Sequence, residues 1–544
     1  MLVLVSGTIR LASGAEGIPV RSDLVRAACG SCHPSDEQGH MSRISYMRKA
    51  PEGWQLTLRR MIRTGNVTLS PDQAREVVRY LSDHHGLAPE EARPFFHRAE
   101  RRPVLETEAD REIEVTCMRC HLAARYATQR RSPEEWDLLK GMHLGYFPVV
   151  ESQTFRGGGG EDPDGLEPED PNTDSWRVDR VLRKLSDRYP LVTPEWRAFQ
   201  AKKGQRSLEG RWLVNAHVPS RGEITGEVSF ASKGTGYGYE ARLIDPDGES
   251  IRRSGEGFLY GGYTWRGRSS GEELGELREV FMLSDDGSSL SGRAFRGAFG
   301  ELGLDVRLVR LGSDPRIAAL VPASIPGGGA RQRVLVSGAN LPVDLGADEV
   351  SFGPGVRVRT LEAIDSNRWI LELETDDGAL PGHRDLAFEN FLSTDALAVF
   401  DRIDYIRVEP EEALARVGGE SAPKQLAQFE AVGFHRGPDD RAFTEDDIRL
   451  GVLPASWGLE EYHGRHDDDD VHYVGTIDDR GLFTPAIDGP NFDRELNADN
   501  MGDVWVVASY TPDGASRPIR GRSRLVVTIP VYVFWDLFPS AGAP

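Results

Sequence analysis

All four cysteines of the 544-residue chain lie in two copies of one pattern, Cys-x-x-Cys-His. The first copy spans residues 29–33 and the second spans residues 117–121. Two thiols at this spacing can add to the vinyl groups of a porphyrin, and the next residue then places an imidazole under the iron. A bare Cys-x-x-Cys could be a redox dithiol or half of a zinc site, but the adjoining histidine, present twice, favours haem. The sequence therefore predicts two covalently bound haem c groups, with the sulfur and iron contacts made by Cys29, Cys32, His33, Cys117, Cys120 and His121.

Covalent attachment of haem to such pentads takes place outside the bacterial cytoplasm, so we expect an exported, periplasmic protein. The first five residues are an apolar run, and residues 13–15 (Ser-Gly-Ala) could form a small-residue cleavage site. No Lys or Arg precedes the apolar run, which departs from the usual signal peptide. We interpret residues 1–15 as a signal-peptide remnant and expect the mature chain to begin near Glu16.

A short internal repeat follows each pentad. Residues 48–54 read Arg-Lys-Ala-Pro-Glu-Gly-Trp, and residues 130–136 read Arg-Arg-Ser-Pro-Glu-Glu-Trp. Proline suits the first position of a helix, and glutamate suits the positive end of the helix dipole. In the second copy Ser132 and Glu135 also have capping-box spacing. Each half is therefore predicted as a pentad, a loop and a helix that carries a tryptophan, in a tandem arrangement.

The repeat also suggests the sixth ligands of the two irons. Met61 lies seven residues after Trp54, and His143 lies seven residues after Trp136, so each pair shares one face of a helix. We expect one haem with His33 and Met61 as ligands and one with His121 and His143. Alternatively, Met61 is a core side chain and His143 a surface histidine, in which case the competing ligands are Met41, Met47, Met142, His40, His84 and His85.

These ligand sets predict a direction of electron flow. A thioether is a poorer donor to ferric iron than an imidazole, so a His/Met haem has the higher potential. We therefore expect electrons to enter at the second haem and to leave from the first.

Composition narrows the class of protein. Hydrophobic residues make up 39% of the chain and charged residues 28%, which is typical of a folded globular protein. The formal net charge of −21 disfavours nucleic acid and anionic lipid as partners. No apolar run is long enough for a membrane span.

The pattern of secondary structure changes after the haem region. We expect an all-α di-haem cytochrome c domain at 16–204, with a flexible acidic segment after Gly157. Short strand-like runs separated by Gly- and Asp-rich turns then predict all-β domains. We place a β-barrel-like domain at 205–312, an immunoglobulin-like (IPT/TIG-like) sandwich at 313–407 and a C-terminal β-sandwich at 408–544.

Beyond these patterns, the chain resembles the α subunit of bacterial quinohaemoprotein amine dehydrogenase. The resemblance runs through nearly the whole chain, in order. It is carried by Ser42-Arg43-Ile44-Ser45, Arg48-Lys49, Pro51-Glu52-Gly53-Trp54, Arg60-Met61, His143-Leu144-Gly145, Arg188-Tyr189-Pro190-Leu191, Tyr263-Thr264-Trp265-Arg266-Gly267 and Leu453-Pro454-Ala455-Ser456-Trp457. It implies a di-haem domain followed by three β domains, and one His/Met and one His/His haem. The short leader and the insertion at 157–174 depart from the family pattern.

The resemblance also implies partners and an activity. The family enzyme is a heterotrimer with a small γ subunit that carries a cysteine tryptophylquinone and a propeller-shaped β subunit. The quinone takes electrons from a primary amine, giving aldehyde and ammonia, and the haems pass them to a soluble cytochrome c or copper protein. Because the quinone needs a cysteine sulfur and the pentads use all four, we expect no catalytic residue for amine oxidation on this chain.

Two other functions remain open from the sequence. One is a di-haem c-type peroxidase, which needs an open sixth position on one iron and an acid/base group beside it. The other is a di-haem electron carrier for a different dehydrogenase.

Overall fold

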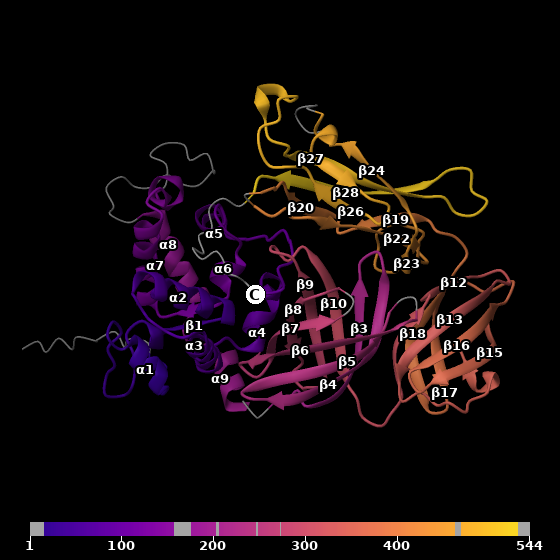
Figure 1. Cartoon of the computed structure of the whole chain (residues 1–544), viewed down its shortest axis with the longest axis horizontal. Helices are drawn as coiled ribbons and strands as arrows, with labels where there is room; N and C mark the ends of the chain where they lie inside the picture. Colours follow the sequence, from indigo (N-terminus) through magenta and orange to yellow (C-terminus); the bar gives the residue numbers. More distant parts are fainter. Residues whose placement is uncertain are drawn as a thin grey trace, which may run out of the picture.

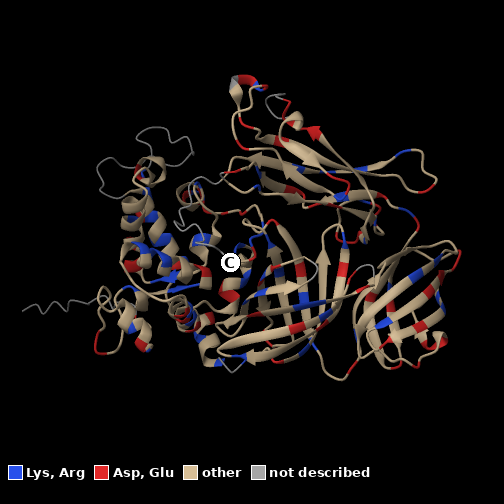
Figure 2. Cartoon of the chain, in the orientation of Figure 1, with Lys and Arg blue, Asp and Glu red and all other residues tan. Residues whose placement is uncertain are grey.

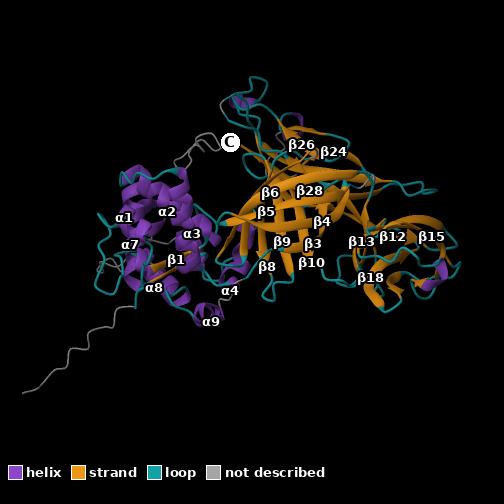
Figure 3. Cartoon of the chain, turned by 60° about the horizontal axis from the view of Figure 1, so that its bottom comes forward, coloured by secondary structure: helices purple, strands orange, loops and turns teal. Residues whose placement is uncertain are grey.

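The computed structural model describes residues 16–156, 176–202, 206–245, 248–271, 274–420, 422–462 and 469–530. A helical N-terminal region is followed by β-sheets that make up the rest of the described chain (Figures 1 and 3). The predicted leader at 1–15 and the acidic segment after Gly157 lie outside the described residues. No described helix is both long and apolar enough to cross a membrane.

The helical region consists of two units that repeat the same order of helices. The first unit contains α1 (Asp23–Cys29), α2 (Pro51–Thr64) and α3 (Pro71–His84). The second contains α5 (Arg111–Cys117), α7 (Pro133–Tyr146) and α8 (Arg177–Arg188). Each unit has a separate hydrophobic core. The other helical elements are η1 (Ile44–Tyr46) in the first unit, α4 (Pro89–Ala92) and η2 (Arg93–Arg98) between the units, α6 (Ala124–Ala127) and η3 (Glu151–Phe155) in the second unit, and α9 (Pro194–Lys202) after it.

The repeated sequence segments pair with each other. Strands β1 (Met47–Lys49) and β2 (Gln129–Arg131) form an antiparallel ribbon in which Arg48 lies opposite Arg130. Helices α2 and α7 begin two residues after these strands and have the same length of 14 residues. The two units are therefore joined through equivalent segments of the repeat.

The tryptophan of each repeat is fixed in the same way. Trp54 and Trp136 are 1% and 0% exposed. The indole N–H of Trp54 donates to the carbonyl of His85 at 2.9 Å, and that of Trp136 donates to the carbonyl of Tyr189 at 3.3 Å. His85 and Tyr189 are the C-caps of α3 and α8. Each tryptophan thus ties its own helix, α2 or α7, to the end of the next long helix of its unit.

We predict that Trp136→Ala lowers the free energy of unfolding of the helical region by about 3–5 kcal/mol, because it removes a fully buried indole and its hydrogen bond. Trp136→Phe, which keeps most of the apolar volume, should cost less. Denaturant unfolding followed by far-UV circular dichroism measures both. Equal stability of Trp136→Ala and the wild type would show that the tryptophan does not hold the unit together.

A buried carboxylate joins the two units at the β-ribbon. Glu91, with its side chain 3% exposed, accepts from Arg48 at 2.7 and 3.0 Å and from Arg130 at 3.0 Å. Burial alone would raise the pKa of the Glu91 carboxyl, but hydrogen bonds and charge from Arg48 and the charge of Arg130 lower this pKa to about 2. The interaction links residues from three separate segments of the chain.

This carboxylate predicts a loss of stability in acid. The pKa of Glu91 falls from its ordinary value of 4.5 to about 2 on folding, so the ionised form stabilises the fold above pH 4.5. As the pH drops from 4.5 to 2, about 3 kcal/mol of unfolding free energy should be lost. Glu91→Gln should remove this part of the pH dependence and cost about 3–5 kcal/mol at pH 7, because two arginines lose their buried partner. An unchanged acid profile in the variant would contradict the assignment.

The first β region is a closed barrel of eight antiparallel strands in the order β10-β3-β4-β5-β6-β7-β8-β9. Its core contains Trp212 and Trp265, both 0% exposed, and extends to Leu87, Ala92 and Phe199 of the helical region. The helical region therefore packs directly on the barrel. The strands are β3 (Gly210–Val218), β4 (Gly222–Lys233), β5 (Gly236–Ile244), β6 (Ser250–Tyr260), β7 (Thr264–Gly271), β8 (Leu277–Leu283), β9 (Ser289–Arg296) and β10 (Leu302–Arg310).

Two four-stranded sheets follow and enclose one core around Trp369. Their orders are β11-β13-β16-β15 and β12-β18-β17-β14. The strands are β11 (Arg316–Val321), β12 (Ser324–Pro326), β13 (Arg331–Ala339), β14 (Val350–Ser351), β15 (Val356–Asp365), β16 (Arg368–Thr375), β17 (Gly382–Phe388) and β18 (Phe391–Phe400); η4 (Ala347–Glu349) precedes β14.

The last described part contains three sheets, with orders β19-β22-β23, β20-β28-β27-β24 and β21-β26-β25. It folds back over the barrel (Figure 1), where His217 of β3 contacts Glu430 of β22 at 2.9 Å. Its elements are β19 (Tyr405–Glu409), β20 (Glu412–Arg416), β21 (Ala427–Gln428), β22 (Glu430–His435), β23 (Ile448–Val452), β24 (Ser456–Glu461), η5 (Asp470–His472), β25 (Gly475–Ile477), β26 (Leu482–Pro485), η6 (Glu495–Asn497), β27 (Gly502–Tyr510) and β28 (Ile519–Thr528).

Two details differ from the sequence-based expectations. The boundary placed between residues 407 and 408 falls inside β19, so the joint lies earlier, between β18 and β19. The predicted capping box of α7 is only half formed: Ser132 accepts from the backbone N–H of Glu135, but the Glu135 carboxylate binds Arg43 instead. Arg43, which is distant in the sequence, binds the glutamate that the local pattern assigns to the helix cap.

Candidate haem centres

Each pentad begins at the last residue of a seven-residue helix. Helix α1 ends at Cys29 and α5 ends at Cys117. In the first pentad the chain turns tightly, because the backbone N–H groups of Cys32 and His33 both donate to the carbonyl of Cys29, at 3.2 and 2.9 Å. The two cysteines and the histidine of a pentad are thereby gathered at one end of a helix.

The four thiols are free and are arranged alike in the two units. Cys29 and Cys117 are half-buried, and Cys32 and Cys120 are exposed. Burial raises the pKa of the Cys29 thiol and raises that of Cys117 to about 12. The Cys29 and Cys117 thiols therefore differ from the reactive cysteine of a redox dithiol, whose pKa is lowered. No group of three or more His, Cys, Asp or Glu side chains suited to a metal ion occurs in the part of the chain that the structure describes.

The second unit brings its two predicted iron ligands together. Burial is the main cause of a lowered pKa for both imidazoles, and it brings His121 to about 4 with a further contribution from the charge of His143. The two rings therefore lie within electrostatic reach of each other. Nδ1 of His121 lies 3.1 Å from the carbonyl of Leu122, and Nδ1 of His143 lies 2.9 Å from that of Leu139.

This arrangement fits iron ligation. A ligating imidazole is neutral and usually donates its second ring N–H to a carbonyl, which fixes the tautomer and leaves the other nitrogen for the metal. Both rings meet these conditions through Nδ1, with Nε2 available. The ring of His143 also packs against Phe155 and Phe147, at centroid distances of 5.6 and 6.2 Å.

In the first unit the fit rests on different observations. Burial lowers the pKa of His33, and the nearby backbone of Ser42 raises it in part. The buried Nδ1 of His33 has no hydrogen-bond partner within ordinary distance among the described residues. Met61 is half-buried on α2, next to Ile62, which packs on the same core as Cys29. Met61 and His143 occupy the same position in helices of equal length, as the repeat predicts.

The competing ligands fall into distinct groups. Met41 and Met47 are buried in the first core, at 0% and 6% exposure, and Nδ1 of His40 binds Asp36 at 2.9 Å. His85 is a stronger competitor, because its ring is 0% exposed and neither ring nitrogen has a partner among the described residues. It packs edge-on against Trp54 at 6.3 Å.

Helices α2 and α7, which carry the predicted sixth ligands, also touch each other (Figure 1). Arg60, which precedes Met61, donates to Sδ of Met142, which precedes His143, at 2.7 Å. The Arg60 guanidinium also lies 6.0 Å from the ring centroid of Tyr146. The predicted sixth ligands therefore lie on helices that contact each other.

Three family models match the chain, and all describe one protein. Residues 20–158 match "Quinohemoprotein amine dehydrogenase A, alpha subunit, haem binding". Residues 205–311 and 406–537 match domains II and IV of the same alpha subunit. The chain belongs to the quinohemoprotein amine dehydrogenase alpha-subunit family. The family resemblance predicted from the sequence is thus confirmed, and the helical region of this alpha subunit is its haem-binding part.

Other comparisons add little about the alpha subunit. No curated protein matches it. Among solved structures, a redesigned beta barrel is 18% identical, with 19% of this chain and 92% of that chain covered, at a TM-score of 0.18. Protocadherin Gamma B2 extracellular cadherin domains 1–5 are 12% identical, with 60% and 74% covered, at a TM-score of 0.17. Such low scores bear on no part of the function.

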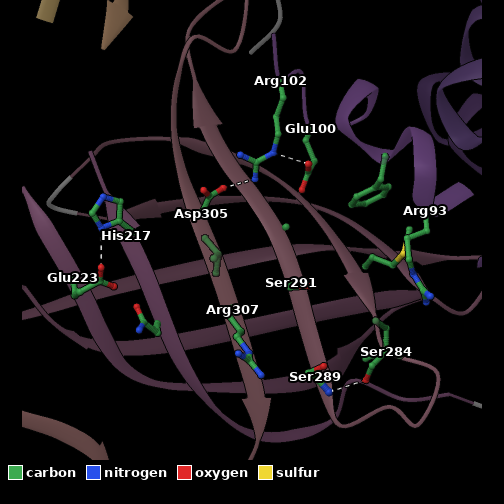
Figure 4. Close-up of a pocket in the computed structure, with 16 residues that line it drawn as sticks. Arg93, Glu100, Arg102, His217, Glu223, Ser284, Ser289, Ser291, Asp305 and Arg307 are labelled. Atoms are coloured by element: carbon green, nitrogen blue, oxygen red, sulfur yellow. Dashed lines mark hydrogen bonds and ion pairs between the residues drawn. The ribbon is translucent and has the colours of Figure 1, made fainter. Parts of the chain in front are cut away.

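A separate cavity of about 690 Å³ lies between η2 and the barrel of the alpha subunit (Figure 4). Its charged side chains largely pair with each other: Arg102 with Glu100 at 2.7 Å and with Asp305, and His217 with Glu223 at 2.7 Å. Hydrogen bonds that the His217 ring donates to the carboxylates of Glu223 and Glu430 raise the pKa of His217 to about 10. The cavity contains none of the predicted haem ligands. The ion pairs of its lining connect the helical region to the barrel and the barrel to the last sheets.

Sequence reasoning missed two groups of charged residues in the haem-binding region. One is the Glu91 carboxylate with its two arginines, and the other is a cluster of Lys49, Arg131, Arg43 and Glu135. The repeated basic pairs at 48–49 and 130–131 were the available signal, since basic residues rarely recur at buried positions without a partner.

Proposed function

We propose that this chain is the electron-transfer subunit of a periplasmic quinohemoprotein amine dehydrogenase. The observation that carries the proposal is the pair of Cys-x-x-Cys-His pentads at equivalent ends of α1 and α5, inside a region that matches the family's haem-binding model. Bound haem c would supply one-electron redox chemistry at each site.

The residues of the chain have defined roles in this proposal. Cys29 and Cys32 hold the first haem and Cys117 and Cys120 the second, each pair by two thioether bonds. His33 and Met61 ligate the first iron, and His121 and His143 ligate the second. The carbonyls of Leu122 and Leu139 orient the two imidazoles of the second site, and Phe147 and Phe155 limit the access of water to it.

The proposal places amine oxidation on another subunit. All four cysteines belong to the pentads, so none remains to build a cysteine tryptophylquinone on this chain. We assign the quinone to a small γ subunit, with a β-propeller subunit beside it, and a soluble cytochrome c or copper protein as the acceptor. The two four-stranded sheets from β11 to β18 are assigned as an immunoglobulin-like domain, and the sheets that begin with β19 are assigned as a C-terminal sandwich.

Purification of the native complex tests this proposal. We expect the haem-bearing chain to co-purify with a small, cysteine-rich subunit that carries a quinone, and addition of a primary amine to reduce the haems in the complex. Reduction should not occur with this chain alone. A di-haem chain that purifies without a quinone subunit would instead favour a carrier for another dehydrogenase, and peroxide turnover by the isolated chain would favour a peroxidase.

A further inference from the structure

A cluster of basic side chains lies at the junction of the two haem units. Although the whole chain is acidic, Figure 2 shows several basic segments in the middle of the helical region. Lys49 on β1 and Arg131 on β2 hold equivalent places in the repeat, and each is 5% exposed. Each also lies over the tryptophan of its own unit, Lys49 at 5.1 Å from Trp54 and Arg131 at 5.7 Å from Trp136.

The ammonium group of Lys49 has no carboxylate of the described residues in ion-pair contact. It donates to Oγ1 of Thr57 at 2.7 Å, and no described carboxylate lies within 4.0 Å of it. Burial lowers the pKa of Lys49 well below its ordinary value, the neighbouring charges of Arg131 and Arg60 lower it further, and the more distant charge of Glu135 acts in the opposite direction. A buried ammonium in these surroundings needs a negative partner.

The other cations of the cluster share a single carboxylate. Glu135, with its side chain 5% exposed, lies 2.7 Å from Arg43 and 3.6 Å from Arg131. The side chain of Arg43 is 42% exposed, so water also screens its charge, whereas Lys49 and Arg131 are two buried cations with only the shared Glu135 carboxylate near them. Burial of an unbalanced cation costs several kcal/mol, so this excess indicates a further anionic group.

The position of the cluster indicates which anion. Lys49 donates to Thr57, which lies one helical turn before Met61 on α2. Arg131 lies over Trp136, which shares one face of α7 with His143. The cluster thus lies beside the helix faces that carry the proposed sixth ligands of both irons. A haem has two propionate carboxylates, on the part of the porphyrin away from the vinyl groups that the cysteines bind.

We propose that Lys49, Arg131 and Arg43 bind haem propionate carboxylates at the junction of the two sites. This inference rests on the proposed function, because it requires haem at the pentads. Cys32 and Cys120, which mark the vinyl side, are exposed, whereas Lys49 and Arg131 are buried. The cations therefore lie where the opposite, propionate side of the porphyrins needs counter-charge. Positive charge here also favours the ferrous state, which carries one positive charge fewer.

The test uses the full chain with both haems attached. Lys49→Met removes the charge and keeps the length of the side chain, and Lys49→Gln is a second, polar variant. Lys184→Gln is the control, because Lys184 is a half-exposed lysine of the same region paired with Asp110 and Glu112. Resonance Raman spectroscopy measures the propionate bending bands, which respond to hydrogen bonding of the carboxylates, and redox titration measures the potentials.

We expect both Lys49 variants to shift the propionate bands and to lower the potential of at least one haem by about 59 mV, a tenfold change in the reduction equilibrium. The control should change neither. A Lys49 variant with two haems, unchanged bands and unchanged potentials would overturn the propionate assignment and leave the proposed function intact. If neither variant folds, the holo-protein structure decides, and a Lys49 Nζ far from every propionate oxygen overturns it. A wild-type chain without haem would instead refute the proposed function.

Discussion

Replacement of both cysteines of the second pentad, Cys117→Ser with Cys120→Ser, should reduce the covalent haem content from two to one per chain. The hydroxyl of serine cannot form the thioether bonds, whereas the first pentad lies in a unit with a separate hydrophobic core and keeps its haem. The mirror variant, Cys29→Ser with Cys32→Ser, should give the same count with the other haem retained. Haem content is measured by the mass of the intact chain and by the spectrum of the denatured protein.

The matched control for this experiment is Ser31→Ala, which changes a variable position of the first pentad and leaves both thiols in place. It should keep two haems. A cysteine-free second pentad that still carries a covalent haem would show that the attachment does not use these thiols. Loss of both haems from either double variant would contradict the independence of the two units.

Exchange of the proposed sixth ligands should move the two potentials in opposite directions. His143→Met converts the second site to His/Met and should raise its potential, because a thioether stabilises ferric iron less than an imidazole does. Met61→His converts the first site to His/His and should lower its potential. Each shift should be a sizeable fraction of the roughly 0.8 V range over which axial ligands set haem potentials. Redox titration of the full chain measures both.

Two further variants separate ligand exchange from general disturbance. Met142→Leu alters the neighbour of His143 at nearly constant volume and should leave both potentials close to those of the wild type. His85→Phe removes the buried imidazole that competes with Met61 and should also leave the first potential nearly unchanged. If His85→Phe shifts that potential and Met61→His does not, the sixth ligand of the first iron is His85.

Much of the helical region could be predicted because its signals are local. The pentads, the proline at the start of α2 and α7, and the seven-residue spacing from Trp54 to Met61 and from Trp136 to His143 all lie within one or two helical turns. The family resemblance added the order of the regions. The equal lengths of α2 and α7 agree with the repeat, although the ligand roles of Met61 and His143 stay predictions.

The features that sequence reasoning missed depend on contacts between distant segments. Glu91 meets Arg48 and Arg130 only because β1 and β2 pair, and no local pattern predicts that pairing. The Glu135 carboxylate binds Arg43, which lies 92 positions earlier in the sequence, and does not cap its own helix. Closure of the barrel, in which β10 pairs with β3, and the contact of His217 with Glu430 have the same long-range origin.

We infer that this chain carries one covalent haem c at each pentad. The most direct measurement is the intact mass of the mature chain purified from the periplasm, together with the haem spectrum of the same sample. We expect a mass above that of the polypeptide by two haem groups, both retained after denaturation. A mature periplasmic chain at the bare polypeptide mass, with no haem absorbance, would contradict it.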